Sequence, residues 1–336
     1  MQPRHCRLAV VQHPPVFLNL ARSFERAVAL IRDALANGAQ CVVFPETWLP
    51  GYPVWLDEAP TAGLWDYAPA KALHQVLSDN AITVPGPELE GLRTLARDGA
   101  ATIVMGAHER VGGTLYNTML LVAANGSYRL HRKLMPTYTE RLVWGMGDGS
   151  TLEPLETPFG RVGGLICWEH WMPLARAAMH AKRETIHIAQ WPGVKELHLL
   201  ASRHYAFEGQ CFVAVAGAVL TRGDVLDGFD SLGLGPHPAR AILEAIPGDD
   251  ATLLLRGSSA IVAPDASYLA GPAPAEATTL YADLELGRIA QGHLALDVDG
   301  HYARPDIFQL TVDDRPQANV VFASESGTES PRADLP

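Results

Sequence analysis

The segment Val162-Gly163-Gly164-Leu165-Ile166-Cys167-Trp168-Glu169-His170 shows the pattern on which this chain is built. Its first half is typical of a buried strand, and a helix-forming segment begins near Trp171. This change of pattern places Cys167 on the turn between the two elements. A thiol at such a turn meets free backbone N–H groups and the positive end of a helix, which favour the thiolate. Because a lone cysteine after a strand is more often structural than catalytic, other residues must decide its role.

Strands and helices alternate on both sides of this segment. Apolar patterns predict strands over residues 7–12, 41–44, 102–106, 186–189, 212–216 and 259–263, and helices over 20–37, 68–77, 89–97, 173–182 and 195–208. Asn125-Gly126 joins two further strand-like runs and predicts a hairpin, which adds antiparallel pairing to the βαβ order. The chain is therefore predicted to be an α/β protein whose mixed sheet is covered by helices.

Composition limits the classes of function. The 336 residues are 48% apolar and 19% charged, which allows a large core and argues against a disordered chain. The 26 basic and 37 acidic residues give a net charge of −11, which disfavours nucleic acid and anionic membranes as partners and suits a small molecule. No apolar run approaches the ~18 residues of a membrane span, and the N-terminus does not resemble a secretory signal. We therefore expect a cytoplasmic protein.

Two stretches lack a regular pattern. Residues 221–256 contain many Gly, Pro and Asp residues and are predicted to be an insertion or surface loop, whereas residues 317–336 resemble a mobile terminus. The length allows two domains, but one core can also serve a chain of this size. We predict a single domain over residues 1–310 and a C-terminal tail over 311–336 that is partly mobile or used in assembly.

The four cysteines are too few and too scattered for a disulfide framework, and none forms a CxxC pair for zinc or redox chemistry. Cys6, Cys41 and Cys211 lie in or beside apolar strand-like runs, where a cysteine usually acts as a small buried hydrophobe. Cys167 differs from them because it follows a strand at a turn.

Two other segments place charged residues beside tight turns. In Val43-Phe44-Pro45-Glu46-Thr47-Trp48-Leu49-Pro50-Gly51-Tyr52-Pro53, the acid follows a buried strand, where open α/β sheets usually build their sites. In His131-Arg132-Lys133-Leu134-Met135-Pro136-Thr137-Tyr138-Thr139-Glu140-Arg141, a lysine and a second acid precede a glycine-rich run with Trp144. Taken singly, these charges also fit a solvated loop acid and a basic hairpin end.

Together the three segments resemble the nitrilase superfamily, whose members carry a Glu, a Lys and a Cys in this order, with a second Glu after the Lys. The long forms Phe-Pro-Glu-Thr-Trp-Leu-Pro-Gly-Tyr-Pro (44–53), His-Arg-Lys-Leu-Met-Pro-Thr (131–137) and Cys-Trp-Glu-His-Trp-Met-Pro-Leu (167–174) are similar to the nitrilase branch. The resemblance spans residues 8–308. It implies a four-layer α-β-β-α sandwich with mixed sheets, and it places Glu46, Lys133, Glu140 and Cys167 on the family's catalytic positions.

The chain departs from the family pattern at two places. Ala266 stands where the family often has Gly in a Pro-Asp-Gly turn, and residues 221–256 match no pattern that can be carried over. The first departure concerns only a turn. The second leaves one rim of the predicted pocket undefined.

The resemblance also implies a mechanism. Cys167 attacks a nitrile carbon and forms a thioimidate, Glu46 acts as the base, and Lys133 lowers the thiol pKa and stabilises charge together with the backbone N–H of Trp168. Glu140 orients Lys133 or serves only as a structural ion pair. All seven tryptophans lie between positions 48 and 191, and we expect the substrate to contact a few residues of this aromatic region and its motifs: Trp168, Tyr52, Trp191, Thr137 and His170. No metal or organic cofactor is expected.

Other functions remain open at this point. An amidase or carbamoylase of the same superfamily, or hydration of a nitrile to the amide, would use the same residues. A metalloenzyme could be built on Cys167, Glu169 and His170, possibly with His187, although this spacing matches no zinc pattern. A third possibility is a non-enzymatic scaffold, because relatives form dimers and spiral filaments; we expect a homo-oligomer in which assembly accompanies catalysis.

Overall fold

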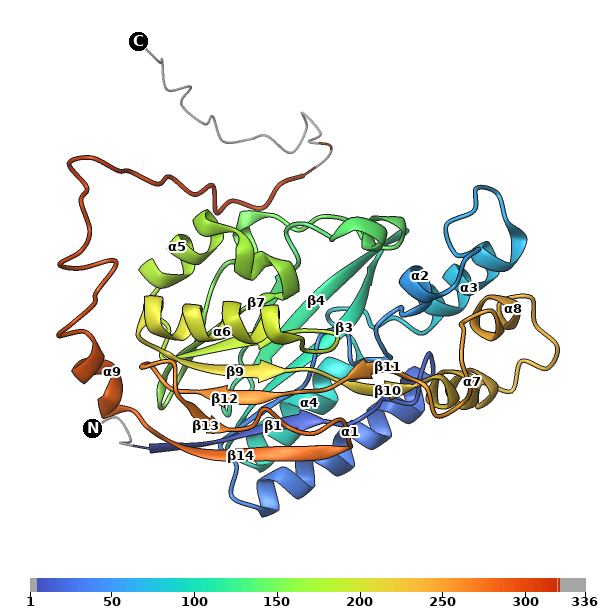
Figure 1. The fold of residues 1–336 in the computed structure, drawn as a ribbon, viewed down its shortest axis with the longest axis horizontal. Coiled ribbons are helices and arrows are strands. Elements are labelled where there is room, and N and C mark those ends of the chain that lie inside the picture. Colours follow the sequence, from blue (N-terminus) through green and yellow to red (C-terminus); the bar gives the residue numbers. More distant parts are fainter. Residues whose placement is uncertain (1–4, 319, 321–336) are drawn as a thin grey trace, which may run out of the picture.

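The computed structural model describes residues 5–318 and 320. In this part of the chain, fourteen strands form two six-stranded mixed sheets and one two-stranded ribbon. The strand pattern, which we interpreted as a mixed sheet, thus belongs to two sheets. The four-layer α-β-β-α sandwich expected from the family resemblance is confirmed (Figure 1).

The first sheet has the order β14-β1-β2-β3-β4-β5. β1 (His5–Gln12), β2 (Cys41–Val43) and β3 (Thr102–Val111) run parallel, while β4 (Thr114–Val122), β5 (Tyr128–Arg132) and β14 (Thr278–Glu285) add antiparallel pairs. The predicted turn at Asn125-Gly126 lies between β4 and β5, so the hairpin prediction is confirmed. β14 was not predicted; it pairs with the whole of β1 from a distant part of the chain.

The second sheet has the order β13-β12-β9-β8-β7-β6. Its parallel centre consists of β7 (Gly160–Ile166), β8 (Ile186–Gln190) and β9 (Phe212–Ala216). β6 (Leu155–Thr157), β12 (Ala260–Val262) and β13 (Tyr268–Ala270) pair antiparallel at its two sides. The ribbon joins β10 (Val219–Thr221) to β11 (Leu253–Arg256).

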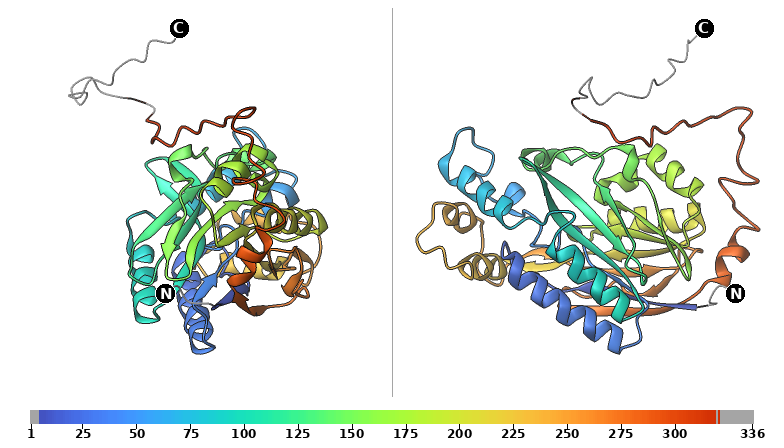
Figure 2. Two further views of the ribbon diagram at one scale, coloured as in Figure 1. Left: turned by 90° about the vertical axis from the view of Figure 1, so that its left-hand side faces the viewer. Right: turned by 180° about the vertical axis from the view of Figure 1, so that it is seen from behind.

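The two sheets pack face to face and helices cover their outer faces (Figure 2). α1 (Leu20–Ala36) and α4 (Pro87–Asp98) lie on the first sheet, whereas α5 (Pro173–Ala181) and α6 (Glu196–Gly209) lie on the second. The largest core cluster contains Val10 and Val104 of one sheet and Ile188 and Val213 of the other, all without exposed surface. Burial of this shared apolar face fixes the spacing of the sheets and hence of their strand ends.

The first helix shows how local sequence sets the elements. The side chain of Asn19 accepts a hydrogen bond from the backbone N–H of Arg22 and caps the helix, and Ala27, Ile31 and Ala34 form its buried face. Gly38 follows the helix with a φ of +82°, a conformation that glycine adopts without strain. The predicted helix and its end are therefore confirmed to within one residue.

Residues 221–256 were predicted to be an insertion or surface loop, and the irregular loop is corrected because the segment has regular structure. It contains α7 (Arg222–Asp230), α8 (Arg240–Glu244) and β11, and it packs on α3 (Ala68–Asp79) beside the short helix α2 (Trp55–Glu58), outside the four layers (Figure 1). A second core cluster explains this order, because apolar side chains of both helices are buried in it: Val225, Phe229, Ile242 and Leu243. Because many glycines interrupt the amphipathic spacing in this segment, the sequence pattern did not predict these helices.

The C-terminal part ends with α9 (Gly287–Gly292), after which residues 293–318 form turns and extended chain. The backbone N–H of Gln317 donates a hydrogen bond to Asp148 (2.8 Å), which ties this segment to the loop after Lys133. Of the tail predicted over 311–336, residue 319 and residues 321–336 lie outside the described residues. Among the helices of residues 5–318 and 320, none combines the length and hydropathy of a membrane span.

Candidate active site

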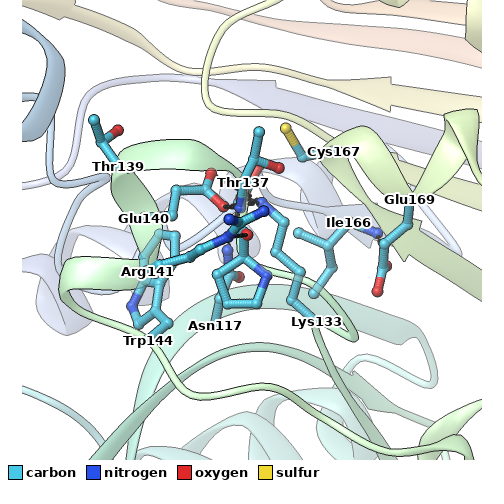
Figure 3. A network of polar contacts seen from close by, with 12 residues as sticks. Asn117, Lys133, Thr137, Thr139, Glu140, Arg141, Trp144, Ile166, Cys167 and Glu169 are labelled. Carbon is cyan, nitrogen blue, oxygen red and sulfur yellow. Dashed lines mark hydrogen bonds and ion pairs between the residues drawn. The ribbon is translucent and has the colours of Figure 1, made fainter.

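Three strand ends place the predicted catalytic residues together. Glu46 follows β2, Lys133 follows β5 and Cys167 follows β7, so the first two come from one sheet and the third from the other. One carboxylate oxygen of Glu46, one of Glu140 and the sulfur of Cys167 all lie within 4.8 Å of one another. Figure 3 shows Lys133 between Glu140 and the strand end that carries Ile166 and Cys167.

Lys133 is the centre of this cluster. Its ammonium lies 2.9 Å from Glu46 Oε1 and 2.7 Å from Glu140 Oε2, and its side chain is fully buried. Burial alone would lower the Lys133 pKa, but the charges of Cys167, Glu46 and Glu140 raise it well above its usual value. Lys133 is therefore a permanent buried cation that links both carboxylates.

Glu140 is held by a capping motif. It lies in the 3₁₀ helix η1 (Tyr138–Leu142), where the backbone N–H of Thr137 donates to Oε2 (2.6 Å). The hydroxyl of Tyr52 donates to Oε1 (2.9 Å). Because the carboxylate also accepts both contacts from Lys133, it is fixed by three elements of the chain. Its position suits an anchor for the ammonium.

Glu46 has the features of a base. Oε1 accepts from Asn117 Nδ2 (2.6 Å) and Lys133, whereas the buried Oε2 has no hydrogen-bond partner among the residues that the structure describes. Burial raises the pKa of Glu46 to about 7, although Lys133 opposes the shift. A carboxylate with a pKa near neutrality and one free oxygen can exchange a proton with a nearby thiol.

The glycine at position 106 lets the Glu46 loop lie this close to β3. A Cβ there would stand 2.1 Å from the backbone oxygen of Pro45 and 2.5 Å from the backbone nitrogen of Thr47. Sequence analysis did not single out Gly106 or Asn117. In the sequence, they are only a small and a polar residue within strand-like segments.

Cys167 begins the 3₁₀ helix η3 (Cys167–Trp171) and has a φ of +57°, a strained conformation for a residue with a side chain. The residue is only 4% exposed, yet it lines the cavity described below. The turn acts in the expected direction, because the backbone N–H of Trp168 lowers the Cys167 pKa, but it does not decide the net shift. Burial, with the charge of Glu46, raises the Cys167 pKa well above its usual value and outweighs the lowering by Lys133. The sulfur is thus a protonated thiol that needs a base.

Glu169 joins the two sheets beside the cluster. Its carboxylate accepts from the backbone N–H of Ile166 and of Leu134, both at 2.6 Å, and from His131 at 2.9 Å. These contacts lower the Glu169 pKa although burial opposes them. Glu169 therefore ties the strand end that carries Cys167 to the segment that carries Lys133, a role that the sequence analysis did not assign.

A cavity of about 560 Å³ opens onto Cys167 and Glu140. Tyr52, Thr137 and Trp168, all predicted to contact substrate, are among its lining residues, as are several residues from α2, α6 and β11. The ribbon strand of the region 221–256 therefore forms part of the rim. The volume is in the range of small-molecule sites.

Two predicted contacts are not part of this lining. Trp191 has no exposed surface and its ring stacks between those of His170 (4.8 Å) and His198 (4.3 Å). His170 is also buried, and its Nδ1 lies 2.7 Å from the backbone oxygen of Cys167. Neither residue therefore lines the cavity: His170 supports the Cys167 turn through this hydrogen bond, and Trp191 packs behind His170.

The geometry does not favour the metal site considered from the sequence. His170 and His187 share a hydrogen bond between their Nε2 atoms (3.0 Å), and Glu169 is occupied by two backbone N–H groups and His131. Within the part of the chain that the structure describes, the cluster with ligand-like spacing is instead Glu46, Glu140 and Cys167. Its carboxylates already share the buried ammonium of Lys133, whose charge would repel a metal cation.

Comparisons with known proteins agree with this geometry. A family model described as carbon-nitrogen hydrolase matches residues 7–293. An aliphatic nitrilase of Sinorhizobium fredii (strain HH103) is 39% identical over 321 residues, covering 94% of this chain and 98% of the relative. A bifunctional nitrilase/nitrile hydratase of Lupinus angustifolius is 39% identical over 323 residues, covering 95% and 89%. The solved structure of a carbon-nitrogen hydrolase from Helicobacter pylori G27 has a TM-score of 0.65 at 19% identity, over 92% of this chain and 100% of that one.

Proposed function

Since this chain belongs to the carbon-nitrogen hydrolase family, we propose that it acts as a nitrilase through Glu46, Lys133 and Cys167. Nitrilases of similar sequence over nearly the full length support the hydrolysis of an organic nitrile to a carboxylic acid and ammonia. The observation that carries the assignment of residues is the buried cluster in which the sulfur lies within 4.8 Å of both carboxylates, which share one ammonium.

In the first step, Glu46 takes the thiol proton while the sulfur attacks the nitrile carbon. Glu46 then gives this proton to the nitrogen, and the product of this step is a covalent thioimidate. Because the thiol pKa is raised and the Glu46 pKa is about 7, transfer of this proton is coupled to the attack. The thiol is thereby activated where the substrate binds.

Two molecules of water complete the reaction. The first, activated by Glu46, adds to the thioimidate, and loss of ammonia leaves a thioester. The second hydrolyses the thioester to the acid and restores the thiol. Lys133 and the backbone N–H of Trp168 stabilise the charge that develops at the reacting carbon, while Glu140 keeps the ammonium in position. In this proposal Glu46 transfers the protons, Cys167 is the nucleophile and Lys133 is the stabilising cation.

Hydration to the amide is the second candidate outcome. One relative is named a bifunctional nitrilase/nitrile hydratase, and the tetrahedral species formed by the first water gives the amide when the thiol leaves instead of ammonia. An amidase or carbamoylase of the same superfamily would instead use the amide or carbamoyl compound as its substrate. Product analysis with a matched nitrile and amide distinguishes these reactions.

The decisive experiment is Cys167→Ala assayed for ammonia release on a panel of aliphatic and aromatic nitriles. We expect complete loss of turnover and, in the wild-type protein, an added mass on Cys167 in quenched samples. Cys211→Ala is the matched control, because Cys211 is a buried cysteine outside the cavity. Turnover by Cys167→Ala at the wild-type rate would refute the mechanism.

We also propose a homo-oligomer, which exposed apolar side chains on η3, α5 and α6 support: Trp171, Leu174, Leu197, Leu200 and Phe207. Light scattering of the wild-type protein and of Leu200→Glu tests this, with a smaller particle expected for the variant. The cytoplasmic location and the single domain over residues 1–310, with its tail, are further proposals. Cell fractionation and limited proteolysis test them.

A further inference from the structure

A chain of buried polar side chains extends from the back of the Cys167 turn into the second sheet. His170 Nδ1 lies 2.7 Å from the backbone oxygen of Cys167, and His170 Nε2 lies 3.0 Å from His187 Nε2. His187 Nδ1 lies 2.9 Å from Glu184, whose Oε2 accepts a hydrogen bond from the hydroxyl of Tyr205 (2.5 Å). All four side chains are buried, and the mechanism above uses none of them.

The hydrogen-bond partners fix the direction of each donor. A backbone oxygen can only accept, so Nδ1 of His170 carries a hydrogen. Burial lowers the pKa of His170 to about 3, so its Nε2 is bare and accepts from His187. His187 has its pKa lowered well below the usual value by burial, and it therefore accepts at Nδ1. The remaining donor is Glu184 in its protonated form, since burial raises its pKa to about 8.

The last link of the chain reaches the sulfur. The backbone oxygen of Cys167 and the N–H of Trp168 belong to the same peptide group, and this N–H lowers the pKa of the Cys167 thiol, although burial raises it overall. Every donor from Tyr205 to Trp168 thus points in the same direction. In such a chain each hydrogen bond polarises the next, which increases the positive charge on the final N–H.

We propose that Tyr205, Glu184, His187 and His170 are positioning residues that act through the Cys167–Trp168 peptide group to stabilise negative charge on the sulfur. They hold the strained turn and orient the N–H that faces the sulfur, both when the thiol attacks and when it leaves. This inference rests on the proposed function only in taking Cys167 as the nucleophile.

Charged and titratable groups surround this series of side chains. They lie on α5 and α6, on β5, within η3 and just before β9: His180, Arg176, Glu208, His131, Glu169 and Cys211. His180 is bonded to Glu208 (3.0 Å), and its ring packs at a tilt against that of Tyr205 (4.5 Å between ring centres). Their placement leaves the His170–His187 contact enclosed by aromatic rings, among them Trp191.

The test is the rate at which iodoacetamide alkylates Cys167, measured against pH on the full-length protein. Tyr205→Phe removes one hydroxyl from the far end of the chain, and we expect alkylation at pH 7 to slow about threefold, as befits part of one net hydrogen bond. His187→Leu breaks the chain and should slow it about tenfold. His187→Gln keeps a donor towards His170 and should recover most of the rate.

Three controls separate this effect from a structural one. Cys167→Ala gives the background from the other cysteines, Tyr128→Phe is the matched hydroxyl deletion on β5, and circular dichroism establishes that each variant is folded. In nitrile turnover, kcat should fall with KM nearly unchanged, because the sulfur and not the cavity is altered.

The outcomes distinguish the two hypotheses. If folded His187→Leu and Tyr205→Phe alkylate at the wild-type rate over the whole pH range, the positioning role is refuted even where the wild type hydrolyses nitriles. If the variants change the alkylation rate but the wild type releases no ammonia from any nitrile, the positioning role stands and the nitrilase assignment fails. Equal slowing by His187→Gln and His187→Leu would also overturn the proposal, because only packing would then matter.

Discussion

Replacing Asn117 by leucine tests whether Glu46 is the base. The variant keeps a side chain of similar size but removes the hydrogen bond from Asn117 Nδ2 to Glu46 Oε1 (2.6 Å). A hydrogen bond to an ionised group contributes about 1.5–3 kcal/mol, and each pKa unit corresponds to about 1.4 kcal/mol. Its loss disfavours the carboxylate, so the Glu46 pKa should rise from about 7 by at least about one unit.

The assay is kcat/KM for ammonia release between pH 5.5 and 9.5, since this ratio reports the ionisation of the free enzyme. The wild-type acid limb should fall near pH 7, with activity lost as the pH decreases through the Glu46 pKa, and the limb of Asn117→Leu should lie at higher pH. Asn80→Ala, which alters the end of α3, is the control and should leave the limb in place. An unchanged limb in a folded Asn117→Leu protein would mean that another group is the base.

Three further predictions concern stability and the backbone. Burial lowers the pKa of His108 to about 4, from a usual value of 6.5. Between these two values the unfolded chain binds a proton at this residue and the folded chain does not, so stability is lost as the pH falls from 6.5 towards 4. The wild-type protein should lose about 2 kcal/mol of unfolding free energy between pH 7 and pH 5 through this residue, and His108→Gln, which can still accept from Trp144, should not. An equal loss in both proteins would contradict this prediction. Ala266→Gly should stabilise the protein by about 0.5 kcal/mol in urea unfolding, because φ is +63° in this turn; a lower midpoint would show that the added backbone freedom dominates. Gly106→Ala should abolish turnover and destabilise the fold by roughly 2 kcal/mol or more, because its Cβ would overlap the oxygen of Pro45; a variant of normal activity would show that the Glu46 loop can move.

The predicted strand ends show what the sequence could reveal. Apolar runs followed by turns located β2 and β7, and these runs alone placed Glu46 and Cys167 at strand ends. The resemblance to known motifs added Lys133 and Glu140, and the cluster brings all four together. These features are local in the chain, and local patterns are what periodicity and motifs report.

The missed features depend on contacts between distant residues. β14 completes the first sheet by pairing with β1, more than 260 residues away (for example Gln12 with Thr278). Asn117 is one polar residue in an apolar strand until Glu46 is placed beside it. The raised Cys167 pKa likewise follows from burial and from two carboxylates that lie elsewhere in the chain.

The contacts of Glu169 affect how the protein loses its activity on heating. The proposed nucleophile lies on one layer of the sandwich and the proposed base on the other, so a small shear between the layers would separate them while every helix and strand remained intact. The carboxylate of Glu169 resists this slippage, because it bonds to the backbone of both layers. On heating, hydrolysis should therefore cease before the far-ultraviolet signal of the helices decays, and Glu169→Gln should widen the interval between these two temperatures.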